Sequence, residues 1–103
     1  MTDRNVIEKL VEQELREANK KYPLFHSSHE AFGVLMEEID ELSDDVIDIK
    51  VKLDEMWNYV REDVNIYGKA WQIHRIAISA VQEAIQVAAM FEKIKMSNLT
   101  EEE

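Results

Sequence analysis

An acidic cluster, Glu37-Glu38-Ile39-Asp40-Glu41, interrupts a regular amphipathic pattern and is the part of this sequence best suited to chemistry. Around it, apolar residues recur at alternating steps of three and four from Phe32 to Val60, the spacing of a packed helical seam. Glu38 and Glu41 are three positions apart, so a helix places them one above the other beside that seam. Two stacked carboxylates repel each other and lose hydration unless a cation lies between them. The pattern therefore predicts a divalent metal ion at this point.

A second acidic position lies far along the chain and is predicted to face the first. The stretch 66–94 repeats the apolar spacing, so the two stretches are expected to form an antiparallel helical hairpin. In that register, Glu83 and Gln86 come within about one turn of the two glutamates and share their flanks of the heptad repeat. Asp45 and Asp48 extend the same acidic wall, and Asp45 is a candidate for a further metal ligand.

Magnesium suits such a wall on chemical grounds. It is a hard ion that takes oxygen ligands in an octahedron and is commonly held by few carboxylates plus substrate phosphates. Manganese is an alternative ion. A metal bound here could link a triphosphate to the protein and activate a water molecule. The competing interpretation is a solvated acidic flank, because surface helices often carry this much charge. Glu83 favours the metal, since it is an isolated acid in an Ala-rich helix and still lands opposite the others.

The elements that must position these residues are predicted to be helical throughout. The chain has 2 glycines and 1 proline and no alternating strand pattern. We expect an all-α fold, an antiparallel hairpin plus an N-terminal helix, in one domain over residues 1–97 with a disordered acidic tail at 98–103. The first helix, which Pro23 ends, should turn five apolar residues inward: Ile7, Leu10, Val11, Leu15 and Ala18.

The ends of the two longer helices also carry local signals. Ser27 and Glu30 form a capping box that begins the second helix, which continues to about residue 61. Weak helix formers between Ser43 and Val51 mark a place where it could break. The turn to the third helix is predicted near residues 62–65, with Asp63 as a candidate N-cap.

Composition excludes several classes of function. The net charge of −10 argues against binding to a nucleic acid polymer, whose phosphates need cationic side chains. The absence of cysteine removes disulfides, thiolate zinc sites and cysteine nucleophiles. The apolar stretch 71–90 holds too many polar residues for a membrane span, and no signal peptide is evident at the N-terminus. We expect a cytoplasmic protein without a membrane partner.

The segments 26–42 and 83–90 resemble the MazG-like members of the all-α nucleoside triphosphate pyrophosphohydrolase superfamily, particularly the small forms of phages and prophages. That family carries Glu-Glu-x-x-Glu on one helix and Glu-x-x-Asp on a later one, which chelate magnesium. Glu37, Glu38 and Glu41 match the first element, and Glu83 matches the start of the second. The resemblance implies hydrolysis of a nucleoside triphosphate to monophosphate and pyrophosphate, in nucleotide house-cleaning or phage nucleotide metabolism.

Two features depart from the family pattern. Gln86 stands where the family has Asp, and the segment between the two elements is longer than usual. We assign catalysis to Glu38 or Glu41, activating a water molecule with the metal. The alternative function is a catalytically weak or inactive helical scaffold or interaction protein of the same fold, which Gln86 favours.

Other candidate residues are weaker. Lys52, Lys69 and Arg75 could reach substrate phosphates from this subunit or a partner, although singly they are ordinary surface charges. Five aromatic residues could stack a nucleobase, although such residues more often serve packing: Tyr22, Phe25, Trp57, Tyr67 and Trp71. Three helices cannot cover every apolar position of so long a second helix, so we expect a homodimer or homotetramer, as the resemblance also implies.

Overall fold

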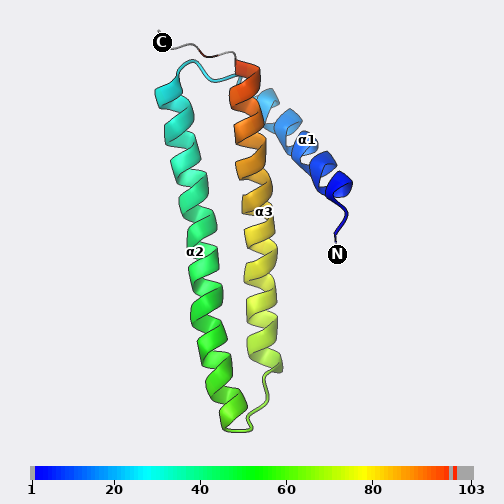
Figure 1. Ribbon diagram of the computed structural model, residues 1–103, viewed down its shortest axis with the longest axis vertical. Helices are drawn as coiled ribbons and strands as arrows, with labels where there is room; N and C mark the ends of the chain where they lie inside the picture. Colours follow the sequence, from blue (N-terminus) through cyan, green and yellow to red (C-terminus); the bar gives the residue numbers. More distant parts are fainter. Residues whose placement is uncertain (1, 98, 100–103) are drawn as a thin grey trace.

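The computed structural model describes residues 2–97 and Leu99, and within them the chain is all-helical with no strand. Its helices are α1 (Arg4–Lys21), α2 (Ser28–Arg61) and α3 (Tyr67–Ser97). Helices α2 and α3 run antiparallel along the length of the molecule, and α1 crosses α3 at an angle near one end (Figure 1). The molecule is elongated, 60 × 27 × 21 Å. The predicted all-α class is confirmed.

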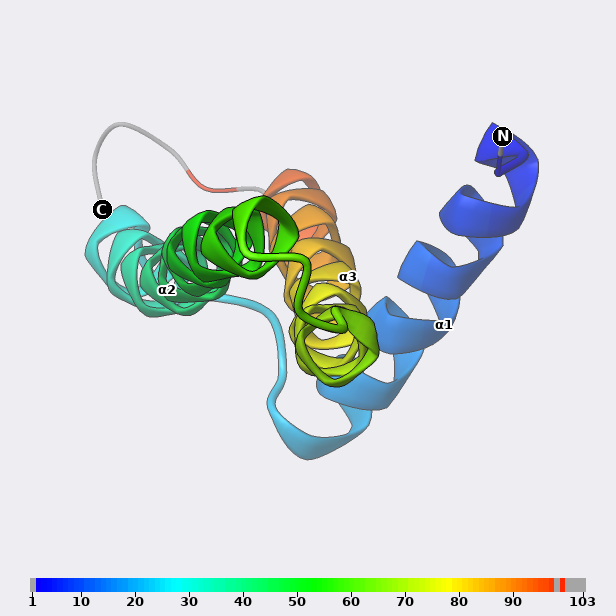
Figure 2. The ribbon, with the colours of Figure 1, turned by 90° about the horizontal axis from the view of Figure 1, so that it is seen from below.

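Among the described helices, α1 packs mainly against α3. Asp3 caps its start, since the Asp3 carboxylate accepts a hydrogen bond from the Asn5 N–H at 2.8 Å. Viewed along the hairpin, α1 lies on the side of α3 away from α2 (Figure 2). Ile7 and Leu10 face α3 as predicted, since each lines a hollow together with α3 residues. Because α1 diverges toward its N-terminus, they nevertheless remain 41% and 43% exposed and are not buried. The other three predicted residues pack against the core: Val11, Leu15 and Ala18.

Helix α2 is continuous over 34 residues, so no break occurs between Ser43 and Val51. Packing along its whole length against α3 outweighs weak local propensity. The Ser27 hydroxyl caps it by accepting from the Glu30 N–H at 3.1 Å, as predicted. The return bond differs from a capping box, because the Glu30 carboxylate accepts from the His26 N–H at 3.4 Å.

The turn between α2 and α3 uses a different cap from the predicted one. Asp63 has a φ of 55°, a left-handed conformation, and so does not act as an N-cap. Instead, the Asn65 carboxamide oxygen accepts from the Tyr67 N–H at 2.7 Å at the start of α3. Both residue types suit a cap, and the path of the turn selects Asn65.

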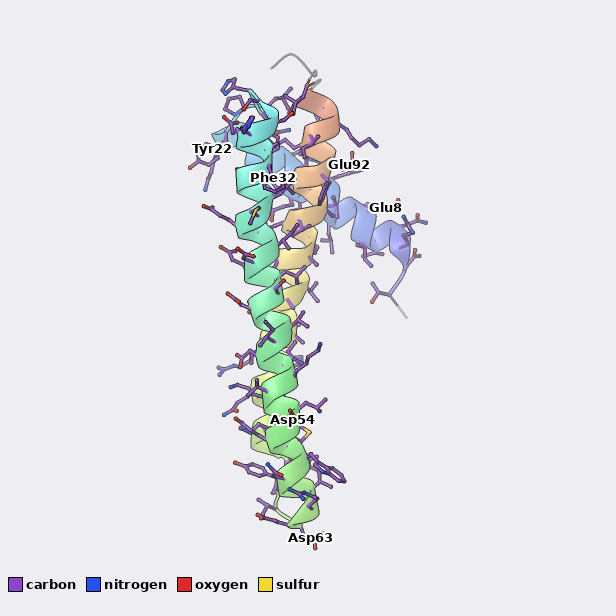
Figure 3. All side chains as sticks on the ribbon, turned by 60° about the vertical axis from the view of Figure 1, so that its left-hand side comes forward. Glu8, Tyr22, Phe32, Asp54, Asp63 and Glu92 are labelled. Atoms are coloured by element: carbon purple, nitrogen blue, oxygen red, sulfur yellow. The ribbon has the colours of Figure 1, made fainter. Side chains whose placement is uncertain are left out.

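The core lies at the end of the molecule where the α1–α2 loop, the start of α2 and the end of α3 meet (Figure 1). Tyr22 and Phe32 lie at this end, whereas Asp54 and Asp63 lie towards the other (Figure 3). Of the tail predicted at 98–103, only Leu99 is described, and it packs against this core; the rest of that prediction lies outside the described residues. The core consists of Phe25, Ala31, Leu35, Ala89 and Met90.

The predicted apolar seam of α2 separates into two rows. One row, spaced by seven residues, is buried or partly buried: Leu35, Leu42, Ile49 and Met56. The other row remains between 40% and 65% exposed: Phe32, Ile39, Val46, Leu53 and Val60. We call these five residues the exposed row. Polar residues at the same spacing, each one position before a member of the exposed row, are instead partly buried: Glu38, Asp45 and Lys52. No helix among the described residues has the length and hydropathy to cross a membrane.

Candidate metal centre

Three glutamates from the two long helices meet at one point, and we call them the acidic triad. Glu38 and Glu41 lie one turn apart on α2, and Glu83 comes from α3 across the seam. Each offers a carboxylate oxygen, and these oxygens all lie within 4.8 Å of one another. Glu38 and Glu83 are partly buried, while Glu41 is exposed to solvent. Heptad register thus placed the three acids correctly.

Gln86 completes the constellation on the α3 side. With its side-chain nitrogen turned toward the acids, it donates to Glu38 Oε2 at 2.9 Å and to Glu83 Oε2 at 3.3 Å. Turned the other way, the same amide presents its oxygen to the carboxylates, which is favourable only with a cation between them. Gln86 can therefore satisfy the acids without a metal and can offer a neutral oxygen ligand with one.

The proximity of the acids changes their proton affinity. Burial, the hydrogen bond with Glu41, and the charges of Glu41, Glu38 and Asp45 raise the pKa of Glu83 to about 7. Burial, together with the charges of Glu41, Glu14 and Glu37, also raises the pKa of Glu38 above its ordinary value. Three carboxylates this close cannot all be ionised cheaply, so the site favours either a shared proton or a metal cation.

This proton affinity predicts how metal-free stability depends on pH. The folded-state pKa of Glu83, about 7, lies above its ordinary value of 4.5, so between these pH values the folded protein holds a proton that the unfolded chain releases. The stabilisation is complete below 4.5 and is lost as pH rises through 7. Solvent screening at this partly exposed group limits it to about 1 kcal/mol.

Thermal unfolding with a chelator, across pH, should therefore show a smaller decline for Glu83→Gln than for the wild type. The variant should be the more stable of the two at about pH 8. Parallel pH profiles for the two proteins would show that Glu83 titrates normally.

The remaining predicted ligands stand outside the triad. Asp45, one turn beyond Glu41, is partly buried and close enough to raise the pKa of Glu83, but is not one of the three grouped acids. Glu37 is exposed and influences Glu38 only through its charge. Its side chain leaves α2 on a different face, because adjacent helical residues are turned by about 100°.

The predicted phosphate-binding residues do not lie at the triad of the same chain. Lys52 pairs with Asp48 on its own helix at 3.3 Å. Lys69 pairs with Glu55 at 2.5 Å and lies 5.6 Å from the centre of the Tyr59 ring, nearer the turn of the hairpin. Arg75 is two turns from Glu83, about 12 Å along α3.

A pocket of about 540 Å³ opens beside the triad, with Glu38 and Gln86 in its wall. Sequence reasoning did not identify three of its charged residues, Glu14, Lys21 and Lys93; the basic and aromatic residues clustered around the α1–α2 loop were the available signal. Of the five aromatic candidates, Tyr22 and Phe25 line this pocket. The other lining residues are Ala18, Pro23, Leu24, His26, Glu30, Val34 and Met90.

The chain matches no protein-family model, no curated protein and no solved structure.

Proposed function

We propose that this protein is a magnesium-dependent nucleoside triphosphate pyrophosphohydrolase. The observation that carries the proposal is the meeting of three carboxylates from two helices, Glu38, Glu41 and Glu83. One of them, Glu38, also lines a pocket large enough for a nucleotide. Such a set fits magnesium, with manganese as an alternative, because its donors are hard oxygens and few enough to leave positions for substrate phosphates.

The chain's own residues would serve two roles, metal binding and proton acceptance. Glu41 and Glu83 would hold the metal, with Gln86 offering an amide oxygen. When bound, the metal would supply charge stabilisation for the phosphates and a lowered pKa for water. Glu38, whose pKa is raised by burial and neighbouring acids, is suited to accept the proton of the attacking water. Attack at the α-phosphorus would break its bond to the bridging oxygen and release pyrophosphate and a monophosphate.

The assay for this function is direct. Purified protein incubated with magnesium and a panel of ribonucleoside and deoxyribonucleoside triphosphates should release pyrophosphate and nucleoside monophosphate in equal amounts. Orthophosphate plus diphosphate would indicate a different cleavage position. The absence of any turnover across the panel would instead favour the alternative function, a helical scaffold or interaction protein with this fold.

Two observations favour the alternative function. Gln86 is neutral where the resembled family has a charged Asp, and its amide can donate hydrogen bonds to Glu38 and Glu83 without a metal. The exposed row of α2 offers an apolar surface to another helix. In either case we propose that the row contacts a second copy of the chain, giving a homodimer or homotetramer, because the row extends along most of α2.

Replacing the amide tests its role in the site. Gln86→Asp adds a fourth carboxylate beside the triad, so we expect magnesium affinity to rise about tenfold, or about 1.4 kcal/mol. Without metal, the added charge should lower stability at about pH 8. Isothermal titration calorimetry and thermal unfolding would measure both effects. Gln82→Asp, an exposed change on the same helix, is the matched control. Equal affinities in the two variants would remove Gln86 from the metal site.

A further inference from the structure

Lys93 of α3 is a cationic side chain almost fully buried beside the acidic pocket, with 3% of its surface exposed. Its Nζ donates a hydrogen bond to the Tyr22 carbonyl oxygen at 3.2 Å and lies 4.9 Å from the centre of the Phe25 ring. Among the residues that the structure describes, Lys93 forms no ion pair with a carboxylate. Within the described part of the chain, the charge is thus buried against a carbonyl and an aromatic face.

The contacts of Lys93 leave N–H donors of its ammonium available to a ligand. A lysine ammonium has three N–H donors, and the Tyr22 carbonyl accepts one of them. Burying an ammonium without an opposite charge is unfavourable, and an apolar side chain of similar length would hold the loop at lower cost. An anion entering the pocket would supply the missing charge and accept the remaining donors.

The position of Lys93 relative to the triad sets the size of that anion. Lys93 and Gln86 line the same pocket and are two turns apart, about 10 Å along α3. A triphosphate chain is comparable in length to this separation. The pocket wall carries a second cation, Lys21. It also carries three carboxylates, those of Glu14, Glu30 and Glu38. The buried ammonium of Lys93 therefore lines the same pocket as Glu38 and Gln86, which belong to the proposed metal site.

We propose that Lys93 binds the terminal phosphates of a polyphosphate ligand whose other end is held through a metal at the triad. The identification of that ligand as a nucleoside triphosphate rests on the proposed function. The anion site itself follows from the burial and contacts of Lys93. A phosphate chain suits both ends, because its oxygens ligate magnesium and also accept charge-assisted hydrogen bonds from an ammonium.

Calorimetric titration with inorganic tripolyphosphate tests the inference with a probe that has no base or sugar. Lys93→Met should weaken tripolyphosphate binding at least tenfold in the presence of magnesium, and Lys93→Arg should keep most of it. Lys95→Met is the matched control, since it removes the same charge from an exposed position two residues away and should change binding less than twofold. Equal affinities for Lys93→Met and Lys95→Met would overturn the proposal.

Titration of magnesium alone separates this proposal from the function of the triad. Lys93→Met should bind magnesium as the wild type does, whereas a parallel loss of magnesium binding would show that Lys93 only supports the fold. If the wild type binds no magnesium, the proposed function fails, and Lys93-dependent binding of tripolyphosphate in a chelator would still establish the anion site.

A measurement on the unaltered protein covers the case in which Lys93→Met does not fold. In protein labelled with ¹³C at the lysine ε-carbons, the signal absent from Lys93→Arg belongs to Lys93. That signal should shift on addition of tripolyphosphate, while the Lys95 signal should not. An unmoved Lys93 signal at saturating tripolyphosphate would contradict the proposal.

Discussion

Glu41→Gln is expected to lower the rate of pyrophosphate release by a factor on the order of 100, equivalent to about 2.7 kcal/mol of transition-state stabilisation. Glu41 is the exposed member of the acidic triad and shares a hydrogen bond with Glu83. Converting its carboxylate to an amide removes one charge from the metal site while keeping the shape of the side chain. Loss of a ligand charge weakens metal binding, and the phosphates of the substrate then lack a fixed cation.

Asp40→Asn provides the control for this change. Asp40 is the neighbouring acid on α2, is exposed and stands outside the triad, so this variant removes the same charge from the same turn. Pyrophosphate release, measured for all variants at one magnesium concentration near the dissociation constant of the wild type, should stay within about twofold of the wild type for Asp40→Asn. If Glu41→Gln keeps the activity and magnesium binding of Asp40→Asn, the triad is a solvated acidic surface and the scaffold function takes precedence.

Leu53→Glu is expected to convert an assembled protein into a monomer. Leu53 is 55% exposed and lies within the exposed row, which we propose to be the surface buried between copies of the chain. A carboxylate placed there would lose hydration in the interface without a partner, so the dissociation constant should rise at least about 100-fold. Light scattering at micromolar concentration measures the mass directly.

Asn58→Glu is the matched change for this experiment, because Asn58 is exposed on another face of α2 and bonds to Arg61 within its own helix. Its mass should equal that of the wild type. Circular dichroism establishes whether Leu53→Glu keeps its helices once dissociated. A wild type that is already a monodisperse monomer, or a Leu53→Glu variant with the same mass as the assembled wild type, would disprove the assembly.

The helices could be predicted from local signals, whereas their faces could not. Pro23 and Ser27 act through their own backbone geometry and neighbouring residues, so the ends they determine follow directly from sequence. The burial of Ile7 and Leu10 depends instead on the angle between α1 and α3, which no local pattern records. In the same way, the heptad pattern of α2 predicted an apolar surface. It did not predict that, in a single chain, the exposed row would remain uncovered.

The candidate site likewise has a part that could be predicted from helix geometry and a part that could not. Heptad register on two long helices was enough to bring Glu38, Glu41 and Glu83 together, because both spacings are fixed by helix geometry. The burial of Lys93 could not be predicted from the sequence, because its contact with Tyr22 joins residues 71 positions apart and depends on the path of the α1–α2 loop. Sequence periodicity predicts contacts between regular elements, and a loop that folds over a helix end lies beyond it.

The placement of the core at one end of a 60 Å molecule has a consequence for folding itself. Buried apolar contacts anchor the end that contains Phe25 and Met90, whereas the opposite end, near Trp57 and Trp71, holds side chains that are 59% and 65% exposed. Local unfolding free energy follows such packing, so the turn of the hairpin should open more readily than the core end. If copies of the chain cover the exposed surface, association supplies part of the cooperativity of folding, and stability becomes a function of protein concentration.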